Sequence, residues 1–512
     1  MRKYPEYKQL DLVRIAEEIN EFWQANDTFV CSIKNREGRP SFTFYEGPPS
    51  ANGEPGIHHV LSRALKDLFC RYKTLQGYQV KRKSGWDTHG LPVELQVEKS
   101  LGIIKEEIGH KISIEEYNAQ CRQTVMRYKD QWEKLTEKLG YWLDIQHPYI
   151  TFDRDYIESI WYLLKQLYVK GLLYRGYSIQ PYSPAAGTGL SSHELNQPGC
   201  YRSVKDLSVV AQFKLKNTEQ DYVLAWTTTP WTLPGNSALA LGESITYVKV
   251  HTYNPYTEKP IQVILAEAVL PRFFTGSSDS QAVANYRPGQ PNIPWEIVER
   301  YQGKELVGLE YEQLLPYVQP TSPAFKIVAG DFVTIEEGTG IVHIAPTFGA
   351  DDMRLAQKLN IPSITVEREG NQVPIVDKQG RFVEEITDWA GKYVKEDYEP
   401  ESVRQQPDYK SVDVLIAIKL KQENKAFQVA KYEHNYPHCW RTDKPILYYP
   451  LDAWFIRTTA YKDRLIALNK TINWKPASTG TGRFENWLEN LVDWNLSRDR
   501  FWGTALPIGR TE

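Results

Sequence analysis

The spacing of apolar residues changes twice within the first 75 positions. Residues 8–24 have the spacing of an amphipathic helix, and residues 41–45 (SFTFY) alternate as a strand does before a turn-forming run, EGPPSANGEPG. From residue 57 the pattern is helical again. Its apolar positions recur at intervals of three and four: Ile57, Val60, Leu61, Ala64, Leu65, Leu68, Phe69 and Tyr72. This pattern predicts a strand, a Gly/Pro loop and a helix with one buried apolar face.

Later segments indicate a change of architecture. Helical patterns over 114–140 and 154–170 lead to a Pro/Gly/Ser-rich stretch at 179–199, which is typical of a domain exit. Residues 205–350 then hold short β-type runs separated by turn residues: LSVVAQFKL, DYVLAW, TYVKVHTY, IQVILAE, FVTI and GIVHI. Helical character returns after about residue 410. A β-rich domain inserted into an α/β fold is the arrangement that we expect.

Composition narrows the range of partners. The 61 basic and 64 acidic residues give a net charge of -3 and form no basic tail, so any RNA contact must be local. The five cysteines include no CxxC pair, so the sequence indicates neither a zinc knuckle nor a disulfide framework. Unpaired cysteines favour a location in the reducing cytoplasm. No run approaches eighteen apolar residues, so we expect no membrane association.

The loop at 46–59 (EGPPSANGEPGIHH) has a composition that suits phosphate binding. A helix that begins after close-packed glycines presents unpaired backbone N–H groups and the positive end of its dipole to an anion. Gly53 lets the backbone approach a nucleotide, and His58 and His59 can donate hydrogen bonds to phosphate oxygens. Taken alone, the loop is a weak signal, and a Gly/Pro turn bearing two surface histidines is the favoured interpretation.

The motif FYEGPPSANG, a His-containing helix start and then GWDTHGLPVE resemble the first signature region of class I aminoacyl-tRNA synthetases, in their isoleucine branch. The resemblance implies that Gly53, Gly56 and His59 contact ATP, with His58 and His59 as the catalytic histidines. One departure concerns the HxGH pattern, because Gly56 stands at the first histidine position and His58 at the glycine position. We hypothesise that His58 supplies the missing imidazole.

A pocket for an amino acid needs a fixed carboxylate for the ammonium group, because an unpaired buried charge costs several kcal/mol. Asp87 is the candidate, with helix capping as its alternative role. The resemblance places Pro48, Trp454 and Trp502 around a branched aliphatic side chain, although each tryptophan alone is also typical of a core.

Two further segments resemble the proofreading site of this branch: WTTTPWTLPGN at 226–236 and GTGIVHIAPTFGADD at 338–352. One methylene contributes only about 1–3 kcal/mol to discrimination in an apolar pocket, a value established on this type of enzyme, so a second sieve is needed. The resemblance implies that Asp352 anchors the substrate ammonium and that His343 shapes the wall. The other expected editing residues are Thr227, Thr228, Thr229 and Asn236. With no protein nucleophile or metal site evident, water is expected to attack the ester.

The resemblance implies an α/β fold, with a Rossmann-like catalytic domain interrupted by a β-rich editing (connective peptide) domain. The expected divisions are a helical extension at 1–40, the first half of the catalytic domain at 41–195, the editing insert at 196–410 and the catalytic domain again at 411–512. We expect the second half of the catalytic fold to be truncated before a KMSKS-like loop and the anticodon-binding domain.

The implied reaction is ATP-dependent activation of isoleucine and its transfer to tRNA(Ile), with Mg²⁺ accompanying ATP, in a cytoplasmic monomer. Isoleucine is favoured over valine because valine enzymes usually carry Lys where this chain has His343, and PNVTG where it has PPSANG. Three alternatives stay open: a sister ligase for valine or leucine, a fragment that only deacylates Val-tRNA(Ile), and a non-catalytic tRNA-binding module. With no KMSKS-like loop, adenylation by this chain is expected to be impaired.

Overall fold

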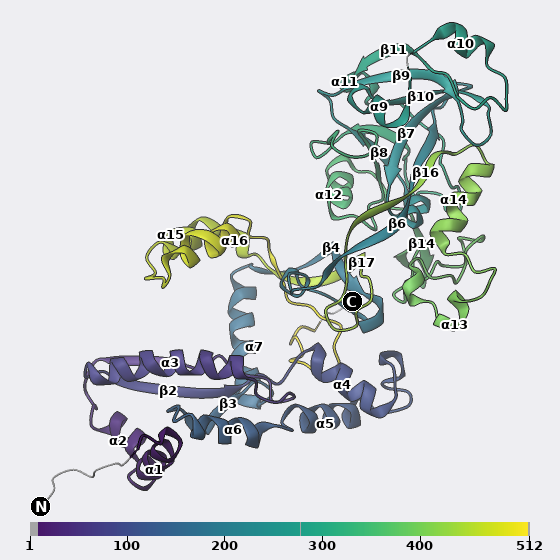
Figure 1. Ribbon diagram of the computed structural model, residues 1–512. Coiled ribbons are helices and arrows are strands. Elements are labelled where there is room, and N and C mark those ends of the chain that lie inside the picture. The colour runs from purple at the N-terminus through teal and green to yellow at the C-terminus, as the bar shows by residue number, and fades with distance from the viewer. Residues whose placement is uncertain (1–8, 277, 510–512) are drawn as a thin grey trace, which may run out of the picture. The chain divides into compact units, whose positions relative to one another are not determined.

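The computed structural model describes residues 9–276 and 278–509, and the chain divides into two compact units. The first unit contains the chain up to Leu173 together with the segment from Arg500, and the second is Tyr174–Asp499. Figure 1 shows the helices and strands of both. No helix among the described residues is both long and apolar enough to cross a membrane.

The first unit is built on a parallel sheet of three strands in the order β1-β2-β3. The strands are β1 (Ser41–Tyr45), β2 (Gln79–Trp86) and β3 (Asp144–Ile150). Parallel neighbours need crossover connections. One is α3 (Ile57–Leu75), and the next contains α4 (Leu91–Leu101), α5 (Ile114–Val125) and α6 (Lys129–Lys138). The remaining helices are α1 (Leu12–Ala25), α2 (Thr28–Lys34) and α7 (Arg154–Val169).

The predicted strand at 41–45 and the predicted helices are confirmed, with a break between α5 and α6. Residue 8, where the first predicted helix begins, lies outside the described residues.

The prediction that α3 buries its apolar stripe is wrong within this structure. Leu65 is 52% exposed and Phe69 is 60% exposed, whereas Arg63, Cys70 and Thr74 are buried. The polar face is the buried one because its groups find partners. The Arg63 guanidinium donates to Thr136 of α6, and Arg82 of β2 donates to the Thr74 hydroxyl at 3.3 Å. Periodicity shows that two helix faces differ, but not which one is covered.

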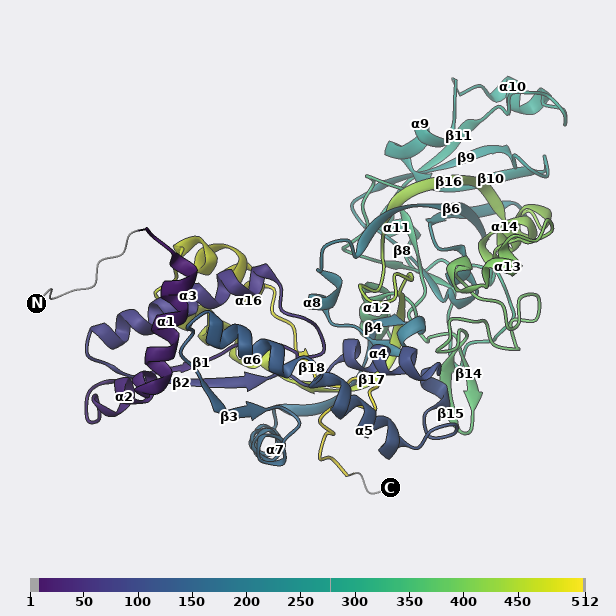
Figure 2. The same cartoon turned by 60° about the horizontal axis from the view of Figure 1, so that its bottom comes forward.

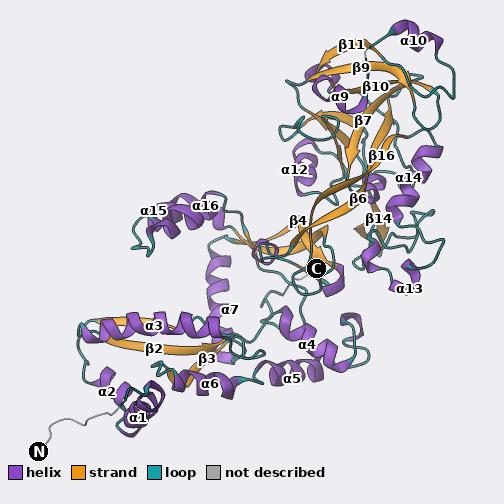
Figure 3. Ribbon diagram, viewed as in Figure 1, coloured by secondary structure: helices purple, strands orange, loops and turns teal. Residues whose placement is uncertain are grey.

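The second unit is dominated by a nine-stranded sheet (Figure 3). Its main path runs β11-β9-β10-β7-β13-β8-β12, and β6 lies between β7 and β16. The strands are β6 (Tyr201–Lys214), β7 (Asp221–Thr227), β8 (Ala238–Leu241), β9 (Thr246–Tyr253), β10 (Pro260–Ala266), β11 (Glu296–Gln302), β12 (Lys326–Ala329), β13 (Ile341–Ile344) and β16 (Ala426–Pro437).

The predicted β-type runs are confirmed except for FVTI at 332–335, which lies in turns after β12. In that segment Val333 packs with Ala240 and Ile344. The run is too short to distinguish a strand from a turn that buries one side chain.

Strands β6 and β16 form a long antiparallel ribbon, paired from Tyr201↔Pro437 to Ala211↔Ala426. Helix α14 (Val412–Gln422) belongs to the same core, which contains Val209, Leu239, Ile264 and Ile416. Figure 2 views the ribbon from another side.

Smaller elements complete the second unit. Four strands pair in the order β18-β17-β4-β5: β4 (Leu173–Ser183), β5 (Thr188–Gly189), β17 (Leu447–Ile456) and β18 (Trp494–Asn495). A separate hairpin joins β14 (Thr365–Arg368) and β15 (Asn371–Pro374). The helices are α8 (Ser192–Leu195), α9 (Leu270–Phe273), α10 (Ser280–Asn285), α11 (Gly303–Leu306), α12 (Ala350–Leu359), α13 (Glu401–Arg404), α15 (Lys462–Asn469) and α16 (Glu485–Glu489).

Candidate functional site

A hollow of about 380 Å³ lies between the β1–α3 loop and α6. Among the residues that line it are Pro48, Gly53, His59, Arg63, Lys66 and Trp132. Three residues predicted from sequence, Pro48, Gly53 and His59, therefore share one cavity, while Gly56 and His58 do not line it. Its position after the first strand and at the start of a helix is the one expected for an anion site.

His59 is held in one tautomer by its own helix. The Gly56 backbone N–H donates to His59 Nδ1 at 2.9 Å, so the ring proton lies on Nε2. Burial, followed by the positive surroundings of His58 and Arg63, lowers the pKa of His59. A neutral imidazole with a protonated Nε2 can donate a hydrogen bond to a phosphate oxygen.

His58 is exposed, and its ring centroid lies 3.8 Å from that of His59. A Cβ added to Gly56 would lie 2.8 Å from His58 Cε1. The imidazole of His58 therefore covers the backbone of Gly56, the position at which the family pattern has its first histidine.

Two cations of α3 line the hollow. Lys66 Nζ lies 2.8 Å from Oε1 of the buried Glu46, which also accepts a hydrogen bond from the Tyr141 hydroxyl. The Arg63 guanidinium lies over the Trp132 ring at 4.9 Å, and burial lowers its pKa from the usual arginine value. The lining also contains Glu54, so two carboxylates balance the two cations, and Arg63 and Lys66 are the charged groups that can pair with a phosphate chain.

Helix α6 fixes the loop from the other side. The Tyr128 N–H donates to the Ala51 carbonyl and Trp132 Nε1 donates to the Gly53 carbonyl, both at 2.9 Å. The Trp132 ring also packs edge-on against His59, with centroids 4.7 Å apart. The conformation of the glycine loop therefore depends on a helix about 80 residues away.

Asp87 follows β2 directly, and its backbone N–H donates to the Pro49 carbonyl at 3.1 Å. Asp87 is exposed to solvent, yet partial burial of its carboxyl group raises its pKa. None of the described cationic side chains forms an ion pair with it. An unpaired carboxylate beside the nucleotide loop can receive a ligand ammonium group.

Trp502 lies close to Asp87 in the first unit. Its Nε1 donates to the Thr88 carbonyl at 2.6 Å, and its backbone N–H donates to the buried Glu94 carboxylate at 2.9 Å. The ring is 6% exposed and packs with a cluster that includes Val93 and Tyr117. Trp454, by contrast, belongs to β17 in the second unit, where its backbone N–H donates to Ser497 Oγ at 2.7 Å.

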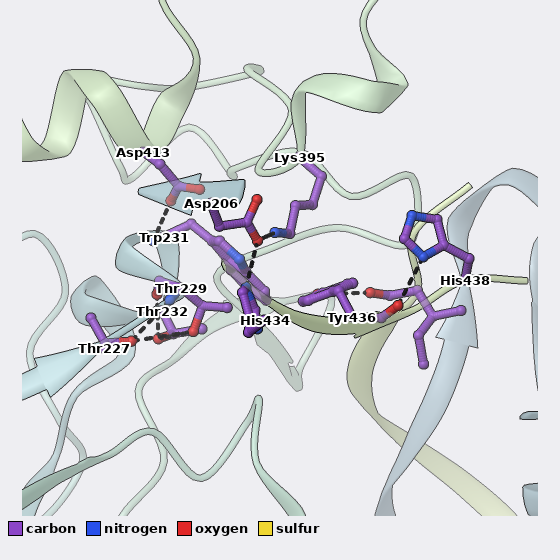
Figure 4. A network of polar contacts seen from close by, with 11 residues as sticks. Asp206, Thr227, Thr229, Trp231, Thr232, Lys395, Asp413, His434, Tyr436 and His438 are labelled. Carbon is purple, nitrogen blue, oxygen red and sulfur yellow. Dashed lines mark hydrogen bonds and ion pairs between the residues drawn. The ribbon is translucent and has the colours of Figure 1, made fainter. Parts of the chain in front are cut away.

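The threonine run of the second unit forms a linked set of hydroxyl groups (Figure 4). Thr227 ends β7, and Thr229 precedes the 3₁₀ turn η3 (Pro230–Gly235). Thr229 Oγ1 lies 3.3 Å from Thr227 Oγ1 and 3.4 Å from Thr232 Oγ1. We call these three side chains the hydroxyl cluster. Their neighbour Thr228 is half-buried.

His343 of β13 joins the hydroxyl cluster through Thr232. The Thr232 hydroxyl donates to the Thr229 carbonyl at 2.8 Å, so it accepts from His343 Nε2, which lies 3.0 Å away. Burial lowers the pKa of His343 to about 4, and its Nδ1 has no partner among the described residues. A ring this weakly basic is a poor general base near neutral pH.

Asn236 lies near the cluster but is used structurally. Its Nδ2 donates to the Ala238 carbonyl at 2.9 Å, and its Oδ1 accepts from the Tyr311 hydroxyl at 2.7 Å.

Asp352 lies in the first turn of α12, the helix that follows β13. Its Oδ2 accepts from the Ala345 N–H at 2.8 Å, and burial raises its pKa to about 6. The segment from β13 to α12 borders the turn that follows the threonine run. Phe348 packs edge-on against Trp231, with ring centroids 5.0 Å apart, and the Ser237 N–H donates to the Ile344 carbonyl at 2.9 Å. The two predicted editing segments are therefore neighbours.

Sequence reasoning missed Thr232 and Asp413. Thr232 stands three positions after Thr229, the spacing at which side chains of a 3₁₀ turn align, so the motif contained a usable signal. Asp413 accepts from the Trp231 N–H at 3.0 Å from a helix 182 positions away, and no local pattern indicates that contact.

Comparison with known proteins gives this geometry its context. Residues 18–512 match the family model of class I tRNA synthetases (I, L, M and V). The chain is 64% identical to an isoleucine–tRNA ligase of Cytophaga hutchinsonii and 58% identical to one of Bacteroides fragilis, in each case over 100% of this chain and 47% of the relative. The chain thus spans about half the length of the curated relatives it matches.

Among solved structures, a LeuRS–tRNA ternary complex from Agrobacterium radiobacter K84 aligns with 84% of this chain and 50% of its own, at 15% identity and a TM-score of 0.32. The family match itself covers nearly the whole sequence and both units. It confirms the resemblance and the mixed α/β class I fold predicted from the motifs. The chain belongs to the class I tRNA synthetases (I, L, M and V).

Proposed function

We propose that this chain forms the isoleucine-activating and proofreading part of an isoleucine–tRNA ligase that acts on ATP, isoleucine and tRNA(Ile). The observation that carries the proposal is the 64% identity, across all of this chain, to a relative that bears that name. A cytoplasmic location and a monomeric state accompany the proposal as predictions.

Activation joins isoleucine to the nucleotide. A carboxylate oxygen of isoleucine attacks the α-phosphorus of ATP, the bond to the β-phosphate oxygen breaks, and pyrophosphate leaves. His59 Nε2–H and the cations Arg63 and Lys66 offset charge on the phosphates, while Asp87 holds the ammonium group. The terminal adenosine hydroxyl of tRNA then attacks the carbonyl carbon and releases AMP.

Mg²⁺ enters this reaction bound to the phosphates of ATP, where it would neutralise their charge. Among the described residues no three His, Cys, Asp or Glu side chains are grouped to hold a metal ion. Of the two carboxylates that line the hollow, Glu46 is paired with Lys66, and Glu54 is the other.

For proofreading, we propose that water hydrolyses the ester of Val-tRNA(Ile). The ester C–O bond breaks, the ribose oxygen takes a proton, and valine leaves. Asp352 anchors the ammonium group and the hydroxyl cluster orients the carbonyl and the water. With a pKa of about 4, His343 acts as a neutral wall and not as the base.

A second candidate function is deacylation without activation. One observation favours it, namely that every candidate editing residue lies in the second unit, whereas the activation residues divide between the two units. A valine-specific sister ligase is the less favoured alternative, since the two relatives described above are isoleucine–tRNA ligases.

Two assays on this chain separate these functions. Isoleucine-dependent ATP–pyrophosphate exchange that exceeds the valine rate and is lost in Asp87→Ala supports activation. Release of valine from Val-tRNA(Ile) that is lost in Asp352→Ala supports proofreading. Deacylation without exchange assigns only the hydrolytic function to this chain, and absence of both from a folded chain overturns the proposal.

A further inference from the structure

Asp413 is a buried carboxylate outside both predicted editing segments. It stands at the second position of α14, and its Oδ1 accepts from the backbone N–H of Trp231 at 3.0 Å. Figure 4 shows it reaching from the helix to the turn that follows the threonine run. The contact joins α14 to the hydroxyl cluster through the backbone of η3.

The Trp231 N–H that Asp413 binds is a group that the capping residue of the turn itself normally binds. At the start of a helical turn the first N–H groups lack partners, and a threonine before the turn usually accepts from the second or third of them. Thr229 holds that capping position before η3, and Trp231 is the second residue of the turn. Yet the Thr229 side chain makes no capping hydrogen bond.

The Thr229 hydroxyl faces the cluster instead. It lies 3.3 Å from Thr227 Oγ1 and 3.4 Å from Thr232 Oγ1. A hydroxyl cannot cap Trp231 and face these two groups in the same rotamer. The capping bond from Asp413 therefore leaves Thr229 available to the site.

Asp413 lies near a buried group of charged side chains. Lys395 is 5% exposed and pairs with Asp206 at 2.7 Å, and His434 Nε2 lies 3.3 Å from the same Asp206 oxygen. Burial raises the pKa of Asp413 to about 7, whereas attraction to Lys395 acts in the opposite direction. Both the ionised and the protonated form keep a carboxyl oxygen that can accept from the Trp231 N–H.

We propose that Asp413 is a positioning residue of the proofreading site: it caps the Pro230–Gly235 turn in place of Thr229, so that the Thr229 hydroxyl stays directed at Thr227 and Thr232. This rests on the hydrolytic function proposed above. Without the cap, Thr229 rotates to bind the Trp231 N–H and its hydroxyl leaves the cluster.

The first test compares Asp413→Ala with Asp413→Asn in deacylation of Val-tRNA(Ile). Asn keeps an oxygen acceptor, so it retains activity to within about threefold. Ala lowers kcat by about tenfold or more with KM little changed, the order expected for the loss of one hydrogen bond. The control, Asp388→Ala, removes a carboxylate that pairs with Lys419 of α14 and keeps full activity. Equal losses in Asn and Ala overturn the proposal.

A double-mutant cycle tests whether Asp413 acts through Thr229. If Asp413 acts through Thr229, then Thr229→Val combined with Asp413→Ala is no slower than Thr229→Val alone. Additive losses overturn the proposal.

Hydrogen exchange of the Trp231 amide tests the capping bond without an activity assay, and it does not require Asp413→Ala to fold. Protection persists in Thr229→Val and Asp413→Asn if Asp413 is the cap. Loss of protection in Thr229→Val would show that Thr229 caps the turn, and would overturn the proposal. If the wild-type chain hydrolyses no ester, the proofreading function fails, while this exchange still decides whether Asp413 is the cap.

Discussion

Gly349 gives the Asp352 carboxylate its space. A Cβ at Gly349 would lie 2.6 to 2.9 Å from the three carboxyl atoms of Asp352, while the backbone of Gly349 is extended and accepts any residue. The obstacle is the movable end of a side chain. An added methyl group therefore shifts the carboxylate without straining the backbone.

Gly349→Ala is expected to raise the KM for Val-tRNA(Ile) by about tenfold, corresponding to about 1.4 kcal/mol of lost binding, with little change in thermal stability. Steady-state deacylation and a melting curve check this. Gly482→Ala is the matched control because nothing lies within 4 Å of its added Cβ. An unchanged KM in Gly349→Ala would count against the anchoring role of Asp352.

The raised pKa of Asp352 predicts a pH dependence with a definite sign. Burial raises that pKa to about 6, so the carboxylate is ionised at pH 7.5 and becomes protonated as the pH falls through 6. A neutral acid cannot pair with the substrate ammonium group. We expect kcat/KM for deacylation to fall about tenfold for each unit below pH 6, and the Asp352→Asn profile to be low and flat over the same range.

At the scale of elements, the loop between β1 and α3 is shaped by α6. Trp132→Phe keeps the ring beside His59 but removes the hydrogen bond to the Gly53 carbonyl. One lost neutral hydrogen bond corresponds to about 0.5–1.5 kcal/mol, so we expect ATP binding to weaken by about two- to tenfold. Calorimetric titration measures the Kd for ATP. As a control, Trp23→Phe in α1 should bind ATP as the wild type does.

The exposed face of α3 gives a prediction about stability. Phe69→Lys should change the free energy of unfolding by less than about 0.5 kcal/mol, because the ring is 60% exposed. Val80→Lys in β2, where the side chain is 2% exposed, should cost about 3 kcal/mol or more. Urea unfolding of both variants compares the two positions, and a large loss for Phe69→Lys would mean that this face is covered in solution.

These elements also show what the sequence could predict. The bounds of β1 and the start of α3 follow from local spacing and turn residues, and the sequence predicts both. The burial of Arg63 was not, because it depends on a partner in α6 whose position no pattern in α3 reveals. The threonine motif led to the hydroxyl cluster, whereas Asp413 reaches it through a backbone N–H, a contact that is independent of residue type and therefore leaves no signature.

At the scale of the whole molecule, the β6–β16 ribbon connects sequence-distant parts of one core. The sequence-based boundary of the insert near residue 410 stays a prediction, and the ribbon suggests a sharper test of it. A segment from Tyr201 to Pro437 keeps α14 and all the β6–β16 pairs, whereas residues 196–410 lack both. We expect the longer segment to unfold in one cooperative transition with a dispersed amide spectrum, and the shorter one to lack it.

The geometry of that ribbon also has a mechanical consequence. Because Tyr201 and Pro437 are paired at the same end, tension that separates them peels the hydrogen bonds one at a time, whereas tension along the strands would load them together. The outermost residues of β6, Tyr201 to Ser203, are exposed, whereas Val209 and Val210 of the same strand are buried. Tension on the flanking chain therefore breaks the outer β6–β16 pairs first, before it reaches the threonine turn beyond β7.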